Sequence, residues 1–345
     1  MMIPLGQAIA ASAFSIVVEI VTSGGKREAQ VLEIASNLAN VPEVTAGSIA
    51  SYADGKASQD PLRVGAAVRA RGLPPNIHLT CVHRDRVAMR QALREMRALG
   101  LHDVFALTGE RQNPPHDFNS IHLTEMIAQS RATDGTPFHI SVAVSPFLYT
   151  RDECEAEYRR LERKVAAGAN LAITQAGWDA RKFAELKRVV DERGLRIPLL
   201  GNVNVLTRRT AEQMIAAQPT RAAISAELMD VLRKESDTPD GGLQARIERA
   251  ARTIAALKGL GYAGAYISGT TSDEHVAQML HRARELESTW EQCASELQFG
   301  ARDGFYVESA ARPTASAASG GVTTPTSGAP DAAHASVAPS ASLHS

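Results

Sequence analysis

Glu19 combines an acidic group with surroundings that could prepare it for proton transfer. It interrupts the apolar run at residues 16–21, where a buried strand would otherwise carry a hydrophobic side chain. A carboxyl group that pointed inward there would have a raised pKa, because burial disfavours its charged form, and could act as a general acid. The pattern alone leaves a second interpretation open, in which Glu19 faces outward and pairs with a cation on a neighbouring helix.

Two further polar residues follow short apolar runs. Gln175 comes after residues 171–174, and its amide offers the edge of a heterocycle both a donor and an acceptor. Glu110 follows Gly109, and glycine permits close approach of the backbone to a ligand. An ordinary loop amide and a turn carboxylate are the alternatives for these two positions.

Other candidate residues are less specific. His78 lies near Cys81, but no further partners with the spacing of metal ligands are visible, which favours a non-metal role for His78. Arg163 and Lys164 end a charged helical segment, where a solvated face that interacts favourably with the helix C-terminus is the simplest interpretation. The chain has no P-loop, no G-x-G-x-x-G turn after a strand and no G-x-S-x-G motif, so these nucleotide-binding and hydrolase folds are not indicated.

The composition favours a cytoplasmic protein that acts on small molecules. The 37 basic and 38 acidic residues are mixed along the chain and give a formal net charge of −1, so no broad field favours nucleic acid or anionic lipid. The three cysteines form no C-x-x-C pair, which argues against a disulfide framework and a cysteine-bound metal. No run reaches the roughly 18 to 20 apolar residues of a membrane span, and no Lys or Arg precedes the apolar N-terminal run as in a secretory signal. We therefore expect no metal, nucleic acid or membrane partner.

Short β-rich runs alternate with helical patterns from about residue 15 to about residue 286, which is typical of βα units around a parallel sheet. Helical segments at 86–99, 151–167, 180–193 and 243–258 are each followed by a glycine that suits a left-handed cap. Eight strands are predicted, at residues 15–21, 41–46, 76–81, 103–107, 138–144, 171–174, 197–203 and 264–268. Eight units favour a closed (β/α)₈ TIM barrel over an open doubly wound sheet.

The barrel is expected to span residues 14–307, after an N-terminal extension at 1–13. Helical stretches at 207–217, 222–234 and 243–258 predict an extra helix before the last strand. The aromatic segment 299–306 is expected to dock back on the barrel. Residues 308–345 are rich in Ala, Ser, Thr, Pro and Gly, and we expect them to be disordered because they cannot bury enough apolar surface to offset their ordering entropy.

Six segments, taken in order, resemble the methylenetetrahydrofolate reductase family over roughly residues 14–290. They are V-E-I at 18–20, V-T-A-G at 44–47, H-L-T-C at 78–81, A-L-T-G-E at 106–110, I-S-V-A at 140–143 and R-K-V-A-A-G-A-N-L-A-I-T-Q at 163–175. The last of these is the most specific. The resemblance implies a flavoprotein that binds FAD, with FMN as the alternative, at the carboxyl ends of the barrel strands. It further implies ping-pong hydride transfer through flavin N5, between NADH or NADPH and the pair 5,10-methylenetetrahydrofolate and 5-methyltetrahydrofolate.

The resemblance also implies roles for single residues. Glu19 matches the general acid that helps to open the folate imidazolidine ring, and Gln175 matches a glutamine that contacts the pterin. Glu110 stands where the family usually has Asp, close to flavin and pterin, so it is a candidate for both catalysis and cofactor binding. Positions that match flavin contacts are Thr45, His78, Glu110, Ala143, Arg163, Lys164 and Ile173. The two cations among them would suit the pyrophosphate.

The chain departs from the family pattern in places. Ser145 replaces a common tyrosine, Ser272 stands about where an arginine assists substrate binding, and the loop 202–208 lacks an aromatic residue that many members stack on nicotinamide or pterin. The H-L-T-C and A-L-T-G-E segments are closer to the subgroup of one-carbon catabolism and acetogenesis, where the reaction could run as oxidation. A homo-oligomer is expected, with a partner subunit as the alternative. Two competing functions are a folate-binding methyltransferase barrel without flavin and a non-catalytic barrel subunit.

Overall fold

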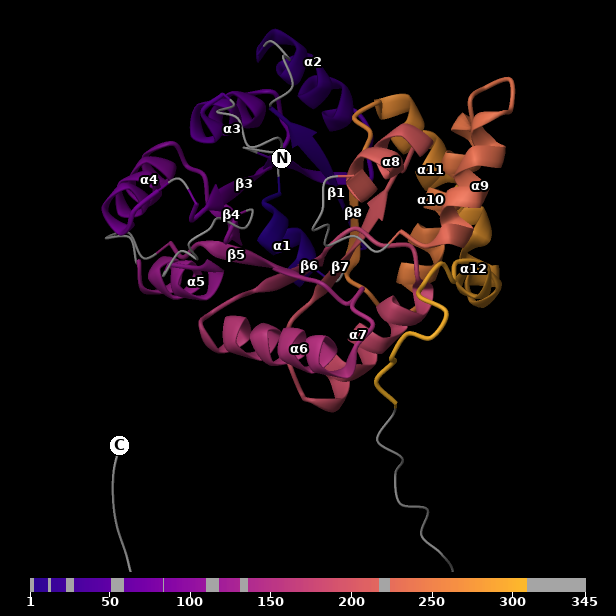
Figure 1. Ribbon diagram of the computed structural model, residues 1–345. Coiled ribbons are helices and arrows are strands. Elements are labelled where there is room, and N and C mark those ends of the chain that lie inside the picture. Colours follow the sequence, from indigo (N-terminus) through magenta and orange to yellow (C-terminus); the bar gives the residue numbers. More distant parts are fainter. Residues whose placement is uncertain are drawn as a thin grey trace, which may run out of the picture. The chain divides into compact units, whose positions relative to one another are not determined.

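Eight parallel strands form a closed barrel in the order β1 to β8, with helices around it (Figure 1). The computed structural model describes residues 3–11, 14–22, 28–50, 59–82, 84–109, 118–130, 136–216 and 224–308. The strands are β1 (Ser15–Val21), β2 (Val44–Ala50), β3 (Pro75–Thr80), β4 (Asp103–Leu107), β5 (His139–Val144), β6 (Leu171–Thr174), β7 (Leu199–Asn204) and β8 (Gly264–Ser268). The predicted (β/α)₈ barrel is therefore confirmed.

The helices that follow the strands cover the outside of the barrel. They are α2 (Glu28–Ala39), α3 (Pro61–Ala70), α4 (Arg86–Ala98), α5 (Ser120–Gln129), α6 (Arg151–Ala166), α7 (Ala180–Glu192), α8 (Arg208–Ala216), α9 (Ala226–Ser236), α10 (Leu243–Gly259) and α11 (Asp273–Leu286). Their apolar faces and the outward side chains of the strands share one buried core. Three helices, α8, α9 and α10, lie between β7 and β8, as expected. No helix among the described residues is long and apolar enough to cross a membrane.

A short helix that the sequence analysis did not anticipate, α1 (Leu5–Ala10), packs against one end of the barrel. Leu5 and Ile9 join the apolar cluster of inward-facing strand residues. The backbone N–H of Gly6 donates a hydrogen bond to Asp103 Oδ1 over 3.1 Å, and Asp103 is the first residue of β4. Helix α1 therefore lies at the end where the strands begin.

Strand β2 begins and ends later than predicted. Pro42 lacks the backbone N–H that a strand ladder needs. Val44 N–H instead donates a hydrogen bond of 3.0 Å to Val41 O, which forms a turn. The strand then runs through small residues to Ala50, with Ser48 opposite Glu19 of β1. Thr45 consequently lies near the start of its strand and not near the end that faces the mouth of the barrel.

The predicted left-handed cap at Gly259 is wrong. Helix α10 continues through Gly259, and the positive φ of 81° belongs to Gly261. A Cβ atom on Gly259 would lie 2.1 Å from the ring of Trp290, so this glycine permits close packing against α12 (Trp290–Glu296). The caps at Gly100, Gly168 and Gly194 do have positive φ, as predicted.

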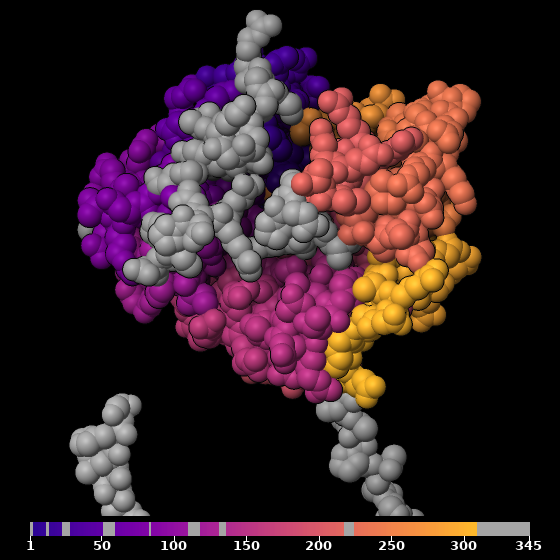
Figure 2. Space-filling model, viewed as in Figure 1, coloured from indigo at the N-terminus to yellow at the C-terminus, as the bar shows by residue number. Residues whose placement is uncertain are grey.

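Residues 297–308, here called the C-terminal strap, lie along α7 and the loop that precedes it. Figure 2 shows the strap in yellow, on the surface beside the magenta part of the chain. Leu297 O accepts a hydrogen bond from Ala180 N–H over 2.7 Å, and Phe299 N–H donates to Trp178 O over 3.2 Å. The aromatic segment thus docks on the barrel, as its composition predicted.

A fully buried lysine fixes the strap to the barrel. The Lys182 side chain is 0 % exposed, and its ammonium group lies 2.9 Å from Glu185 Oε2 and donates to Phe305 O over 2.8 Å. Glu185 also accepts hydrogen bonds from the Tyr158 hydroxyl and from Val307 N–H. The charges are therefore paired with each other and with the strap backbone, which is the condition under which burial of an ion pair is tolerated.

Substitution of Lys182 by Met should lower the free energy of unfolding by roughly 3–5 kcal/mol, because Glu185 would be left as a buried carboxylate without its cation. Lys187→Met is the matched control on the same helix. Its ion pair with Asp191 is partly solvated, so the loss should be only about 0–1 kcal/mol. Denaturant unfolding of both variants checks the difference, and equal losses would contradict the importance assigned to the buried pair.

Candidate functional site

Five polar side chains from four strands form a connected chain inside the barrel, here called the interior polar network. The Tyr266 hydroxyl donates to Glu19 Oε1 over 3.2 Å and lies 3.4 Å from His78 Nε2. The same His78 nitrogen is 2.9 Å from Ser48 Oγ, which accepts a hydrogen bond of 3.5 Å from Asn76 Nδ2. Glu19 therefore points inward, and the outward-facing alternative is excluded.

The surroundings of Glu19 favour its neutral form. Burial raises the pKa of this carboxyl group, and the hydrogen bond from Tyr266 only partly opposes that effect. Strands β1, β2, β3 and β8 contain no Lys or Arg that could stabilise the carboxylate. A carboxylic acid with a raised pKa is suited to donate a proton to a bound ligand.

His78 is a neutral group in this network. Its burial lowers its pKa to about 3, so the ring carries no charge near neutral pH. The edge of the ring packs against Phe105 of β4, with ring centroids 4.9 Å apart and planes at 85°. His78 can therefore donate or accept a hydrogen bond, but it offers no positive charge to an anionic ligand.

A second cluster of polar side chains lies at the carboxyl ends of β7 and β8. Ser268 Oγ donates to Asn202 Oδ1 over 2.8 Å and accepts from Asn204 Nδ2 over 2.9 Å. Asn204 Oδ1, Thr80 Oγ1 and Ser145 Oγ are buried and have no hydrogen-bond partner within the described part of the chain. Because buried polar atoms are almost always paired, these three groups at or just beyond strand ends indicate a polar ligand or water.

The structure brings several residues with predicted roles together between β5 and β6. Ala143 pairs with Ile173 across the two strands, and both belong to the cluster inside the barrel. Lys164 is 4 % exposed, and its ammonium group donates to Ala143 O over 2.5 Å. Gln175 is half-buried and extends the same ladder, since its N–H donates to Val144 O over 2.8 Å.

Thr45 and Arg163, which also have predicted roles, do not lie with the residues between β5 and β6. Thr45 Oγ1 accepts a hydrogen bond of 3.3 Å from Ile16 N–H, near the start of the strands. Arg163 is exposed on α6, which agrees with a solvated helix face. Glu110 lies outside the described residues, so its roles stay predictions.

Sequence reasoning missed Tyr266, Asn202, Asn204 and Ser268. The three small polar residues could have been found from their alternation along the last two strands, where an inward face recurs every second residue. Tyr266 carried no such signal, because tyrosine is common in strands for packing reasons alone.

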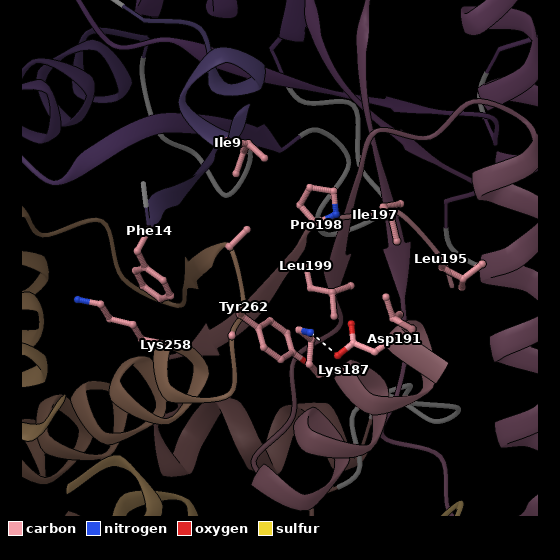
Figure 3. A pocket seen from close by; sticks show the side chains of 13 residues that line it. Ile9, Phe14, Lys187, Asp191, Leu195, Ile197, Pro198, Leu199, Lys258 and Tyr262 are labelled. Carbon is pink, nitrogen blue, oxygen red and sulfur yellow. Dashed lines mark hydrogen bonds and ion pairs between the residues drawn. The ribbon is translucent and has the colours of Figure 1, made fainter. Parts of the chain in front are cut away.

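A pocket of about 500 Å³ lies at the opposite end of the barrel, near α1 (Figure 3). Ile9, Leu199 and Tyr262 contribute to its lining, and Lys187 at its edge is paired with Asp191. None of the residues with predicted roles lines this pocket. In barrels of this type the reactive groups lie at the carboxyl ends of the strands, so the pocket is not the candidate active site.

The low pKa of His78 should make the fold acid-sensitive. The ring titrates at about 3 when folded and near 6.5 when unfolded, so its contribution to stability is complete above about pH 6.5 and is lost as the pH falls toward 3. Between about pH 7.5 and 4.5 the wild type should lose roughly 2–3 kcal/mol more of its free energy of unfolding than His78→Gln does. Denaturant unfolding at several pH values measures this.

The exposed His281, replaced by Gln, is the control for that experiment, since its side chain is 68 % exposed. This variant should stay within about 1 kcal/mol of the wild type at every pH, because the ion pair of His281 with Glu285 is exposed to solvent. If the free energies of unfolding of the wild type and His78→Gln changed in parallel with pH, the prediction would be contradicted, because the His78 ring would then protonate freely in the folded state.

Comparison with known proteins agrees with the sequence resemblance. A family model described as Methylenetetrahydrofolate reductase matches residues 11–283, which include all eight strands. The 5,10-methylenetetrahydrofolate reductase of Escherichia coli is 28% identical over 173 residues, covering 48% of this chain and 56% of that protein. Methylenetetrahydrofolate reductase 2 of Schizosaccharomyces pombe is 23% identical over 263 residues, covering 66% of this chain and 38% of that protein. The chain thus matches less than two thirds of the length of these relatives.

A solved structure supports the fold. An uncharacterized protein from Clostridium thermocellum, described as binding two copies of 5-methyl-5,6,7,8-tetrahydrofolic acid, has a TM-score of 0.59 and 13% identity. The superposition covers 83% of this chain and 99% of that one. At this identity the likeness concerns the fold alone. The family model, which spans most of the chain and its whole barrel, shows that this chain belongs to the methylenetetrahydrofolate reductase family.

Proposed function

We propose that the protein is a flavin-dependent oxidoreductase that interconverts 5,10-methylenetetrahydrofolate and 5-methyltetrahydrofolate, with NADH or NADPH as the hydride partner. The observation that carries the proposal is the inward carboxyl group of Glu19, whose pKa is raised by burial. The names of the relatives support the reaction, and the ligand in the description of the Clostridium thermocellum protein supports the substrate class.

The residues at the mouth of the barrel fit a flavin in chemical character. The three unpaired polar atoms of Thr80, Ser145 and Asn204 suit the polar edge of a flat heterocycle. Ala143, which is partly exposed, offers apolar surface to such a ring beside the buried Ile173, and the buried ammonium group of Lys164 suits an anionic part of the cofactor. With His78, these residues would hold the flavin, FAD or FMN, which supplies hydride transfer through N5 when bound.

Glu19 and Gln175 act on the folate in this proposal. Glu19 donates its proton as the imidazolidine ring opens, and it takes the proton back when the reaction runs toward the methylene form. The amide of Gln175 orients the pterin through donor and acceptor groups on one side chain. Helix α1 covers the end of the barrel interior where the strands begin, and the Glu19 side chain is partly buried. We place this activity in the cytoplasm and expect a homo-oligomer.

A partner-dependent form of the same barrel is the second candidate, and the end of β8 favours it. Ser272, which stands about where the family has an arginine, accepts a hydrogen bond of 3.2 Å from His275 N–H and caps α11. It supplies no charge for a folate tail. The small polar residues of β7 also provide no aromatic surface for nicotinamide. A partner subunit that delivers the electrons would replace these contacts.

A visible absorption spectrum separates these possibilities. We expect the purified protein to bind FAD or FMN, to bleach on anaerobic addition of NADH and to recover its colour with methylenetetrahydrofolate. Binding without bleaching by either pyridine nucleotide would favour the partner-dependent form. A protein that binds folate but no flavin would contradict the proposal and favour a methyltransferase barrel.

Glu19→Gln should separate the two half-reactions. Reduction of the flavin by NADH should stay within about twofold of the wild type, whereas its reoxidation by the folate should slow about 10²- to 10⁴-fold, because only the second step needs the acid. Anaerobic stopped-flow absorbance measures both steps. Glu28→Gln on α2 is the control, since Glu28 pairs with Arg63 on the outer surface. Equal losses in both half-reactions would refute the role of Glu19.

A further inference from the structure

We infer that Tyr266 is a positioning residue for Glu19, and that its hydroxyl group holds the carboxyl group in both of its protonation states by turning between Glu19 and His78. The inference rests on the proposed function, because it concerns the acid of that reaction. Tyr266 lies in none of the segments that carry the family resemblance.

The strand register places the phenol beside the acid. Tyr266 of β8 pairs with Val17 of β1, and Glu19 is the next residue of β1 on the same inward face. The ring is 2 % exposed, and it packs against Phe105 with centroids 6.3 Å apart. Its hydroxyl oxygen then lies 3.2 Å from Glu19 Oε1 and 3.4 Å from His78 Nε2. The hydroxyl therefore bridges two groups that do not contact each other in the interior polar network.

A hydroxyl group can serve both states of the acid because it donates one hydrogen bond and accepts others. When Glu19 is ionised, Tyr266 donates to the carboxylate. When Glu19 is protonated, its own O–H can donate to the Tyr266 oxygen, and the tyrosine O–H can turn to His78 Nε2 in the tautomer that leaves this nitrogen free. His78 stays neutral for this purpose, because burial keeps its pKa near 3.

Within the described strands, the interior polar network contains no other charged group. Among the described residues, Glu19, His78 and Tyr266 are the ionisable side chains on β1, β2, β3 and β8 that belong to the interior network. From β4 and β5, Asp103 and His139 face the end closed by α1, where Asp103 accepts a hydrogen bond from Gly6. Strand β7 contributes the uncharged Asn202. Tyr266 is therefore the donor that opposes the effect of burial on Glu19.

Tyr266→Phe removes that donor and keeps the ring. The midpoint for ionisation of Glu19 should rise by about one pH unit, since the hydrogen bond to the ionised carboxylate is roughly twice as strong as the one to the neutral acid, and both are lost. Proton donation then persists to higher pH, so the descending limb of the folate half-reaction should move upward by the same amount. Its plateau rate should fall several-fold, because the carboxyl group loses its orientation, and flavin reduction should be unchanged.

Infrared titration of the purified full-length protein tests this without turnover. The carboxylic C=O band of Glu19 is identified by its loss in Glu19→Gln, and its midpoint is then compared in the wild type and in Tyr266→Phe. Tyr262→Phe is the matched control, since this tyrosine is also buried and donates over 2.9 Å to Phe183 O, outside the network. Tyr262→Phe should leave the midpoint unchanged. Tyr266→Met, a second variant without the hydroxyl, should raise it as Phe does.

The outcomes separate this inference from the proposed function. An unchanged midpoint in both Tyr266 variants would overturn the inference even if the wild type reduces folate. A raised midpoint in both, with Tyr262→Phe at the wild-type value, would support it even if no folate turnover is found. A wild-type protein that binds no flavin and reduces no folate would overturn the proposed function alone.

Discussion

The parallel pairing of β8 with β1 closes the barrel, and the candidate site depends on this contact. Gly264 makes the pairing possible, because a Cβ atom at this position would lie 2.0 Å from Ser15 O. The same pairing brings Tyr266 to Glu19, two residues 247 positions apart in the chain. Closure of the barrel thus also forms the hydrogen bond that opposes the effect of burial on the pKa of Glu19.

Most of the helices and strands could be predicted from the sequence, whereas the hydrogen bonds of the interior polar network could not. The bounds of β1, β4, β6 and β8 follow from β-branched and apolar runs between helical segments. Strand β2 did not follow, because its small residues carry little strand signal and Pro42 precedes it. That shift explains why Thr45, although it lies in a segment resembling the family, is remote from the mouth of the barrel.

The site itself could be predicted only one residue at a time. Glu19 was identifiable because a carboxyl group inside an apolar strand is unusual, and Lys164 and Gln175 were identifiable from the resemblance. The direction of a side chain could not be predicted from the sequence. Arg163 and Lys164 therefore looked equivalent, although Arg163 is exposed and Lys164 is buried. Tyr266 was missed because its partners come from other strands, and contacts across a closed barrel leave no local pattern. The C-terminal strap similarly supports the β6 loop through Trp178, only three residues after Gln175.

Among the described residues, helix α1 covers the interior at the end where the strands begin. Leu5 and Ile9 pack there against the inward apolar cluster, so a molecule that binds beside Glu19 is expected to arrive and leave past the carboxyl ends of the strands. Under the proposed reaction the nicotinamide and the pterin would both enter past the carboxyl ends of the strands. The two substrates could then not bind at the same time. Their alternating order of binding would follow from the shape of the barrel, whatever their relative affinities.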